Sequence, residues 1–391
     1  MSRLWKMIEN ARANADLFAD VKHSKNVRVL VNMLGPAYRG LIEQRGRTRH
    51  VEIPAAHSAV FDLDYVHDQP ELHRLYEAAK RSQWNATTDI DWSIDVDPHH
   101  PERDLFPEHL LPLADLPAYR KLPLKEKQLH RHAILAWMLS QFLHGEQAAL
   151  FAACQVVEAV RWLDGKLYGS TQVVDEGRHV EVFHTYLDEK LQKRYVINDN
   201  LYVLVDSLLS DGRWDLKFLG MQIMIEGLAL GAFGTLRAST EEPLLRQILR
   251  YVITDEARHV HYGVVALREY YQALPEKERR EREDWAFEVA VLMRNRFLAH
   301  EFYDEYYGHV MSRRAWDEAL LQSPYMERFR RMMFKRLIPN LKRIHLLSDR
   351  IRPHYEALGL LEWEHEKAAP ELSAEELLAE SEAPPPYRQS A

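Results

Sequence analysis

One segment occurs twice in this chain, and it limits the fold and the chemistry more than any other feature. In the first copy, Glu146 is followed after 28 intervening residues by Asp-Glu-Gly-Arg-His at positions 175–179. In the second copy, Glu226 is followed after the same gap by Asp-Glu-Ala-Arg-His at positions 255–259. The repeated order and the identical gap indicate two equivalent units.

The spacing inside each unit brings metal-ligand side chains together. Residues three apart on a helix are neighbours on one face, so Glu176 with His179, and Glu256 with His259, can reach one metal ion. A gap of about 30 residues fits the rest of one helix, a short turn and an antiparallel return to the level of the lone Glu. Two such hairpins face to face would supply four carboxylates and two imidazoles, the ligand set of a two-metal site.

A solvated charged helix face is the simpler alternative, because Glu-x-x-His also occurs at Glu181/His184 and at Glu362/His365. A single pair of this kind carries little information. The doubled context favours the metal interpretation, since each copy repeats the same Asp, Arg and upstream Glu. Six buried ionisable groups without a metal would also cost several kcal/mol per unpaired charge.

Composition narrows the class of protein. The net charge of -8 and a pI near 6.2 give no sign of the basic stripe of a nucleic-acid-binding protein. Cys154 is the only cysteine, which excludes a disulfide within the chain and fits a reducing compartment. No signal-peptide pattern occurs, and no window approaches the ~20 consecutive apolar residues of a membrane span. We therefore expect a cytoplasmic protein without a membrane span.

Four regions are expected along the chain. Residues 1–123 combine N-terminal helices with a Pro-rich covering segment, and residues 124–274 form the core of two hairpins. Residues 275–367 form C-terminal helices that pack on this core, and residues 368–391 form a disordered acidic and Pro-rich tail.

The pattern also predicts the boundaries of the core helices. The first is expected over 124–163, followed by a turn at 164–169, and the third over 214–238. Thr240 is the expected N-cap of the fourth helix. Glu226 stands in an otherwise almost uncharged stretch, where a lone carboxylate needs a partner, and a metal ion is the best candidate.

At these residues the chain resembles the ferritin-like di-iron carboxylate proteins. These include the ribonucleotide reductase small subunit, the hydroxylase subunits of multicomponent monooxygenases, acyl-carrier-protein desaturases and arylamine N-oxygenases. The resemblance implies an all-α fold, a ferritin-like four-helix bundle with additional N- and C-terminal helices. It also implies six metal ligands. Glu146, Glu176 and His179 would serve one iron, and Glu226, Glu256 and His259 the other. The carboxylates of Glu176 and Glu256 would bridge the two irons.

The resemblance further implies roles for neighbouring residues. Asp175 and Asp255 would each accept a hydrogen bond from the His of the opposite motif, while Arg178 and Arg258 would neutralise these acids. Ordinary ion pairing is the alternative for all four. Five apolar residues on or near the ligand faces could form a substrate pocket, although plain core is the favoured interpretation for any single one of them: Leu150, Ala153, Phe183, Leu230 and Phe233.

Several markers of the named subfamilies are absent. Phe183 occupies the position of the radical-bearing Tyr of the reductase subunit, and Val252 the position of the additional His ligand of N-oxygenases. Ala229 and Leu230 stand where many monooxygenases and desaturases have a Thr. The subclass and the substrate therefore stay open.

The function implied is that of an O2-activating di-iron oxidoreductase, of the monooxygenase, hydroxylase or desaturase type, with two Fe ions per chain or an Mn/Fe pair. Its substrate would be a mainly apolar organic molecule. The chain has no flavin or nicotinamide fingerprint and lacks the cysteines of an iron-sulfur cluster, so a separate reductase or ferredoxin would supply electrons. Alternatives are an N-oxygenase, a Mn/Fe ligand-binding oxidase, a ferritin- or rubrerythrin-like ferroxidase, and a metal-free helical interaction protein. A homodimer is compatible with the sequence.

Overall fold

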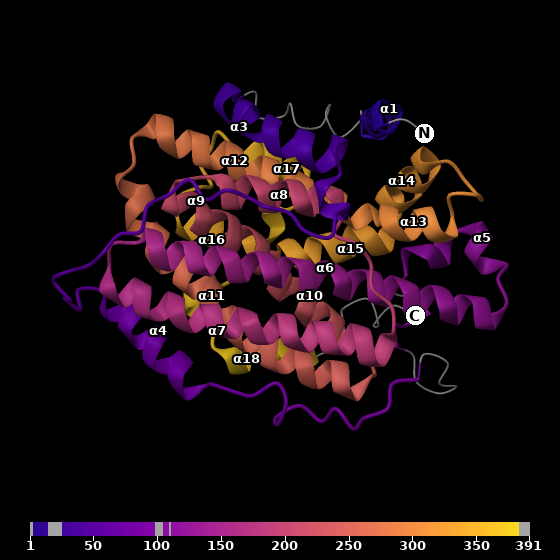
Figure 1. The fold of residues 1–391 in the computed structure, drawn as a ribbon, viewed down its shortest axis with the longest axis horizontal. Coiled ribbons are helices and arrows are strands. Elements are labelled where there is room, and N and C mark those ends of the chain that lie inside the picture. The colour runs from indigo at the N-terminus through magenta and orange to yellow at the C-terminus, as the bar shows by residue number, and fades with distance from the viewer. Residues whose placement is uncertain (1–2, 15–25, 98–104, 109–110, 383–391) are drawn as a thin grey trace.

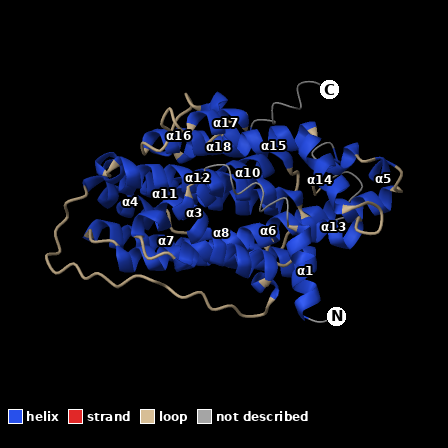
Figure 2. Cartoon of the chain, turned by 90° about the horizontal axis from the view of Figure 1, so that it is seen from above, coloured by secondary structure: helices blue, strands red, loops and turns tan. Residues whose placement is uncertain are grey.

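The computed structural model describes residues 3–14, 26–97, 105–108 and 111–382. In these ranges the chain forms α-helices, short 3₁₀- and π-helical stretches, loops and turns. None of the described residues forms a strand (Figures 1 and 2). The all-α class expected from the sequence is confirmed.

Four long helical segments form the centre of the molecule. They are α6 (Leu124–Ala159), α7 (Leu163–Thr185), the continuous run of α9 (Trp214–Phe218), a π-helical stretch (Leu219–Ile225) and α10 (Glu226–Ser239), and α11 (Pro243–Ala273). α6 packs along α7, α10 packs along α11, and α7 also contacts α11. The two hairpins thus face each other, with the α6–α7 pair in front in Figure 1.

The turn between α6 and α7 lies earlier than predicted. Only residues 160–162 separate the two helices, so Gly165 and Gly169 lie inside α7 and the expected turn at 164–169 is wrong. A Cβ atom on Gly169 would lie 2.8 Å from Cγ2 of Val157. These glycines therefore serve the close approach of α7 to α6 instead of a reversal of the chain.

The N-cap of α11 also differs from the prediction. The carboxylate of Glu242 accepts hydrogen bonds from the backbone N–H groups of Leu244, at 2.8 Å, and Leu245, at 2.6 Å. Thr240 instead ends α10, and its hydroxyl donates to the carbonyl of Leu105 at 3.0 Å. A carboxylate at this place also interacts favourably with the helix dipole.

The remaining helices cover the four central ones. The N-terminal ones are α1 (Arg3–Ala13), α3 (Val27–Ala37), α4 (Pro70–Arg81) and α5 (Pro117–Arg120). In the chain, α8 (Asp199–Ser210) connects the first hairpin to the second. The C-terminal helices are α12 (Glu276–Asn295), α13 (His300–Tyr306), α14 (Arg313–Gln322), α15 (Pro324–Phe334), α16 (Leu337–Arg343) and α17 (Arg352–Ala357). α4 packs on α7, and α15 packs on α10.

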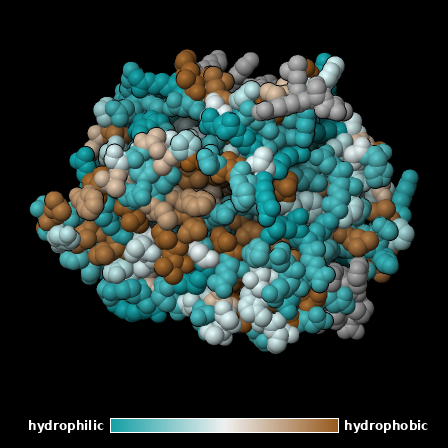
Figure 3. All heavy atoms as spheres, viewed as in Figure 1, coloured by the Kyte–Doolittle hydropathy of each residue, from teal (hydrophilic) through white to brown (hydrophobic). Residues whose placement is uncertain are grey.

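An extended segment, residues 48–69, connects the N-terminal helices to α4 across the front of the molecule in Figure 1. It is held to α6 by a hydrogen bond from Val60 N–H to the carbonyl of Glu158, at 2.8 Å. Phe61 and Leu63 in this segment are 84% and 76% exposed. Apolar residues gather on the left half of the face shown in Figure 3.

The C-terminal segment is more ordered than its composition predicts. Instead of disorder from residue 368, the chain forms α18 (Ala374–Glu382), which packs on α10 and α11. Arg237 on α10 donates a 2.7 Å hydrogen bond to Ser381 and pairs with Glu382, while Leu377 is buried. The expected disorder of residues 383–391 lies outside the described residues.

One described helix is long and apolar enough, by length and composition alone, to cross a membrane. It is the segment Trp214–Ser239, with a mean hydropathy of 1.4 over its most apolar window. Of that window, 89% is buried inside the protein. This degree of burial is that of the core helix of a bundle.

Gly231 tests how tightly α15 packs on α10. An added Cβ atom would lie 2.8 Å from both the Cα atom and the carbonyl oxygen of Met333, so Gly231→Ala must displace backbone. We expect it to lower the free energy of unfolding by about 1–3 kcal/mol in chemical denaturation. Gly234→Ala on the same helix has no described atom within 4 Å of the new methyl group and should raise it by up to about 1 kcal/mol. Equal effects of the two substitutions would contradict this packing.

Candidate metal centre

The four central helices bring all six predicted ligands to one place. None is more than 5% exposed. α6 carries Glu146, and α7 carries Glu176 and His179. α10 begins with Glu226, and α11 carries Glu256 and His259.

Their ligand atoms form two overlapping groups. Within each group, one donor atom of every residue lies within 4.8 Å of the others. The first group comprises Glu146, Glu176, His179 and Glu256, and the second comprises Glu176, Glu226 and His259. Such an arrangement is what two neighbouring ions that share a ligand require.

Two carboxylates lie between the two imidazoles. Nδ1 of His179 is 3.4 Å from Glu176 and 3.3 Å from Glu256. Nδ1 of His259 is 3.1 Å from Glu176 and 3.5 Å from Glu256. Glu176 and Glu256 are therefore positioned to bridge two ions, as the resemblance implies.

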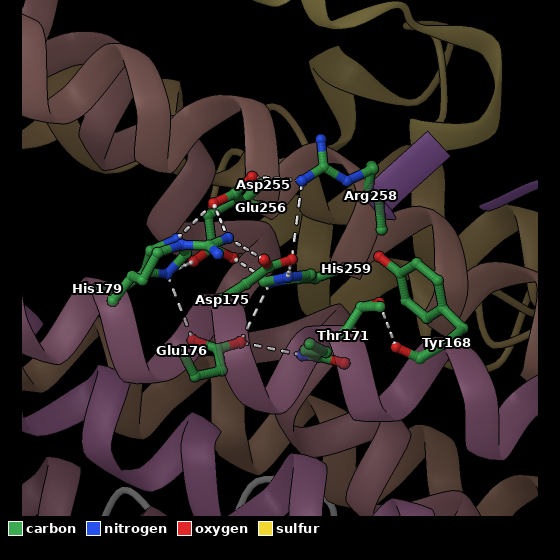
Figure 4. A network of polar contacts seen from close by, with 12 residues as sticks. Tyr168, Thr171, Asp175, Glu176, His179, Asp255, Glu256, Arg258 and His259 are labelled. Atoms are coloured by element: carbon green, nitrogen blue, oxygen red, sulfur yellow. Dashed lines mark hydrogen bonds and ion pairs between the residues drawn. The ribbon is translucent and has the colours of Figure 1, made fainter. Parts of the chain in front are cut away.

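The outward nitrogen of each imidazole is held by the opposite hairpin (Figure 4). Nε2 of His179 is 3.2 Å from Asp255, and Nε2 of His259 is 3.2 Å from Asp175. A proton on Nε2 that is donated to the carboxylate leaves the lone pair of Nδ1 directed at the cluster. This is the crossed pattern that the resemblance implies.

Two arginines link these acids into a closed ring. Arg178 pairs with Asp175 on its own helix and lies 3.6 Å from Asp255 on the other. Arg258 pairs with Asp255 and lies 3.7 Å from Asp175. Two positive and two negative charges thus balance in the layer outside the ligands. Ion pairing and orientation of the histidines, which the sequence presents as alternatives, occur together.

A tryptophan outside the repeated segments completes this layer. The indole N–H of Trp84 donates to Asp255 at 2.8 Å, and the ring stacks on Tyr251 at 4.9 Å between centroids. Its neighbour Gln83 accepts a 2.6 Å hydrogen bond from Arg178. For residues 84–92 the sequence favours a packed covering loop over the lining of an access route to the metals. No local signal reveals these contacts, since Trp84 and Asp255 are 171 positions apart.

Two buried glutamines outside the predicted site also support the ligands. Nε2 of Gln172 donates to Glu226 at 2.9 Å and to Glu176 at 3.1 Å. Nε2 of Gln222 donates to the amide oxygen of Gln172 at 3.1 Å. Each glutamine stands four residues before a predicted ligand, on the same helix face. That spacing is a signal by which the sequence could have identified them.

The protonation of the cluster reflects its burial. Burial raises the pKa of Glu146 and of Glu226 well above the usual value of a carboxyl group, and the charge of Glu256 adds to this effect. Burial alone would lower the pKa values of His179 and His259, but the surrounding carboxylates outweigh it and raise them well above the usual value. Without metal, protons therefore neutralise part of the cluster.

Buried ligand atoms that lack a hydrogen-bond partner indicate that metal ions fit this site. One oxygen each of Glu176, Glu226 and Glu256, together with Nδ1 of His259, is buried without a hydrogen-bond partner in the described part of the chain. Buried polar atoms are rarely left in this state unless they bind an ion or water. Four carboxylates would also balance the charge of two divalent ions.

Four of the five residues expected to line a pocket are buried. Phe183 and Phe233 stack at 5.7 Å, and Phe142 packs edge-on against Phe233 at 4.7 Å. Ala153 and Leu230 are buried, whereas Leu150 is partly exposed. An apolar cavity of about 40 Å³ lies elsewhere, beside the N-terminal half of α6, with Trp137 and Met138 among its lining residues. The role of the five predicted residues in a substrate pocket stays a prediction.

Comparisons with known proteins gave matches only among solved structures. No family model and no curated protein matches the chain. An R2-like ligand-binding oxidase with an aerobically reconstituted metal cofactor after photoconversion is 18% identical, with a TM-score of 0.48, over 72% of this chain and 95% of that one. An R2-like ligand-binding oxidase with an aerobically reconstituted Mn/Fe cofactor is 18% identical, with a TM-score of 0.46, over 73% and 94%.

The crossed hydrogen bonds predict the effect of Asp255→Asn. Loss of the carboxylate charge weakens the hold on Nε2 of His179, and we expect metal affinity to fall about 10- to 100-fold. Competition between the protein and a chromophoric chelator for Fe(II) under anaerobic conditions measures this change. Glu181→Gln is the control, because it makes the same change from carboxylate to amide at an exposed residue of α7, two positions from His179. Unchanged affinity in Asp255→Asn would contradict the role of this acid.

The raised pKa values predict that metal binding releases protons. His179, His259, Glu146 and Glu226 hold protons to higher pH than usual in the metal-free protein, but each must lose its proton to bind a metal. Metal affinity should therefore rise with pH until these groups are deprotonated and fall as the pH is lowered. Calorimetry near pH 7 in two buffers of different protonation enthalpy should give different heats. Identical heats would exclude the predicted proton release.

Proposed function

We propose that the protein is an O2-activating oxidoreductase with a dinuclear centre of iron, or of manganese and iron. The observation that carries this proposal is the buried cluster of four carboxylates and two imidazoles, two of whose carboxylates lie between both imidazoles. Oxygen-rich sets with imidazole suit iron and manganese better than soft metals. A purely structural role would not require so many unsatisfied ionisable atoms at the centre of the bundle.

Each ligand has a distinct place in this proposal. One ion would be held by Glu146 and His179, the other by Glu226 and His259, with Glu176 and Glu256 shared. When bound, two redox-active ions would supply the electrons that reduce O2.

The surrounding side chains keep the ligands in place. The Asp255 and Asp175 carboxylates hold the Nε2 protons of the two histidines, so that the imidazoles do not rotate. Gln172 donates to both Glu226 and Glu176 and thus keeps one oxygen of each carboxylate directed toward its amide. Rigid support of this kind holds a reactive site in one geometry.

Aromatic residues that flank the ligands along α6 and α7 would exclude water from one side of the cluster. Phe142, four residues before Glu146 on α6, packs with Phe183 and Phe233, and all three rings are buried. An apolar wall of this kind protects a reactive site from side reactions with water. It also favours a mainly apolar organic substrate, consistent with a hydroxylating or desaturating enzyme.

Electrons for turnover would come from a separate reductase or ferredoxin. The proposal rests on the sequence, which has one cysteine and no flavin or nicotinamide fingerprint. A partner of this kind is therefore part of the proposed function.

Oxygen consumption tests the proposal. Metal-free protein is titrated with Fe(II) without oxygen and then exposed to air. We expect saturation at about two irons per chain, and O2 uptake that stops unless reductant is supplied. Glu176→Ala should abolish both iron binding and O2 uptake, because it removes the ligand shared by both groups, whereas exposed Glu181→Gln should change neither.

Two results would overturn the proposal. An iron-loaded protein that is inert to O2 would exclude O2 activation. Continued oxidation of many irons per chain, with a ferric core accumulating, would identify a storage protein instead.

A further inference from the structure

A second group of metal-ligand side chains lies at the other end of α7. Asp164 is in the first turn of α7, His73 is in the first turns of α4, and His67 is in the extended segment that precedes α4. One donor atom of each lies within 4.8 Å of the others. Asp164 is twelve residues from Glu176, about 18 Å along the helix axis, so this group is separate from the dinuclear cluster.

Both imidazoles direct the same nitrogen at one carboxylate oxygen. Nδ1 of His67 is 2.6 Å from Oδ1 of Asp164, and Nδ1 of His73 is 3.3 Å from the same atom. The other oxygen of Asp164 accepts a 3.1 Å hydrogen bond from the backbone N–H of Gln69. Asp164 is fully buried, while the side chains of His67 and His73 are 53% and 43% exposed.

One of these nitrogens is left unsatisfied. Nδ1 of His73 is buried and makes no hydrogen bond within the described residues, although it lies near Asp164. A purely structural contact between α7 and the segment that leads into α4 is already provided by His67 and by the backbone N–H of Gln69. It does not account for a second imidazole that offers its buried nitrogen to the same oxygen.

The donor set and its spacing fit a divalent metal ion. Zn²⁺ binds imidazole nitrogen and carboxylate oxygen at about 2.0–2.2 Å in tetrahedral geometry, which separates neighbouring ligand atoms by about 3.3–3.5 Å. The pair of His73 and Asp164 already has this spacing. His67 would have to withdraw by about 0.7 Å, and its exposed side chain has room to do so.

We propose that His67, His73 and Asp164 bind one divalent ion of the Zn²⁺ class, in a mononuclear site with a position open to water. The site is distinct from the dinuclear centre and does not depend on the function proposed for that centre. Three protein ligands at a partly exposed place leave room for a fourth, exchangeable ligand.

The ion would fasten α4 to α7. α4 buries Leu72, Leu75 and Ala79, and it leads directly into Gln83 and Trp84, which contact Arg178 and Asp255 beside the dinuclear cluster. Binding at the first turns of α4 would therefore stabilise the segment that completes the surroundings of the main centre.

Zn²⁺ itself is the probe. The full chain is freed of metal, and Zn²⁺ is titrated against a chromophoric chelator, with bound metal counted by mass spectrometry. Wild type should bind one equivalent more than His67→Ala or His73→Ala, or bind that equivalent at least tenfold more tightly. His184→Ala is the matched control, because His184 is half-exposed on α7 and pairs only with a neighbouring Asp188 in the described structure.

The two sites can be told apart in the same experiment. His179→Ala should weaken binding at the dinuclear cluster but keep the equivalent that depends on His67 and His73. Circular dichroism confirms that each variant is folded, which is expected because both histidines are partly exposed. Equal numbers of Zn²⁺ ions, bound equally tightly, in wild type, His67→Ala and His73→Ala would overturn the proposal.

Discussion

Burial of six ionisable side chains at the centre of a helical bundle is the constraint on which the rest of the structure depends. Taking charges out of water costs several kcal/mol each unless partners compensate. The compensation lies one layer outside the ligands, in the ring of Asp175, Arg178, Asp255 and Arg258 and in the amide of Gln172. The bundle is therefore polar where a helical protein is normally most apolar, and its apolar core continues around this polar centre.

The ligand cluster could be predicted because its information is local. Glu176 and His179 share a helix face, and repetition of the motif distinguishes them from the exposed pair of Glu181 and His184 on the same helix. Trp84 could not be predicted in this way. Its contact with Asp255 is created only when α4 packs on α7 and α11, and a single indole in a loop has no periodicity to reveal it.

The errors in the fold predicted from the sequence have a common cause. Periodicity reports which face of a helix is buried but not what covers it. The sequence favours a turn at Gly169 because it does not show that Val157 lies against this residue. Composition predicts disorder for the acidic helix α18 because its anchor, Arg237, is 144 positions from Ser381. Composition predicts the behaviour of a segment in isolation, and tertiary partners change that behaviour.

The crossed hydrogen bonds make the two hairpins dependent on each other. His179 on α7 is oriented by Asp255 on α11, and His259 on α11 is oriented by Asp175 on α7. Either hairpin alone contains a complete sequence motif, yet neither can orient its own imidazole. The metal-binding geometry is thus a property of the assembled bundle. Because ions that bind only this geometry stabilise the folded state, metal binding and the docking of the two hairpins must be thermodynamically linked.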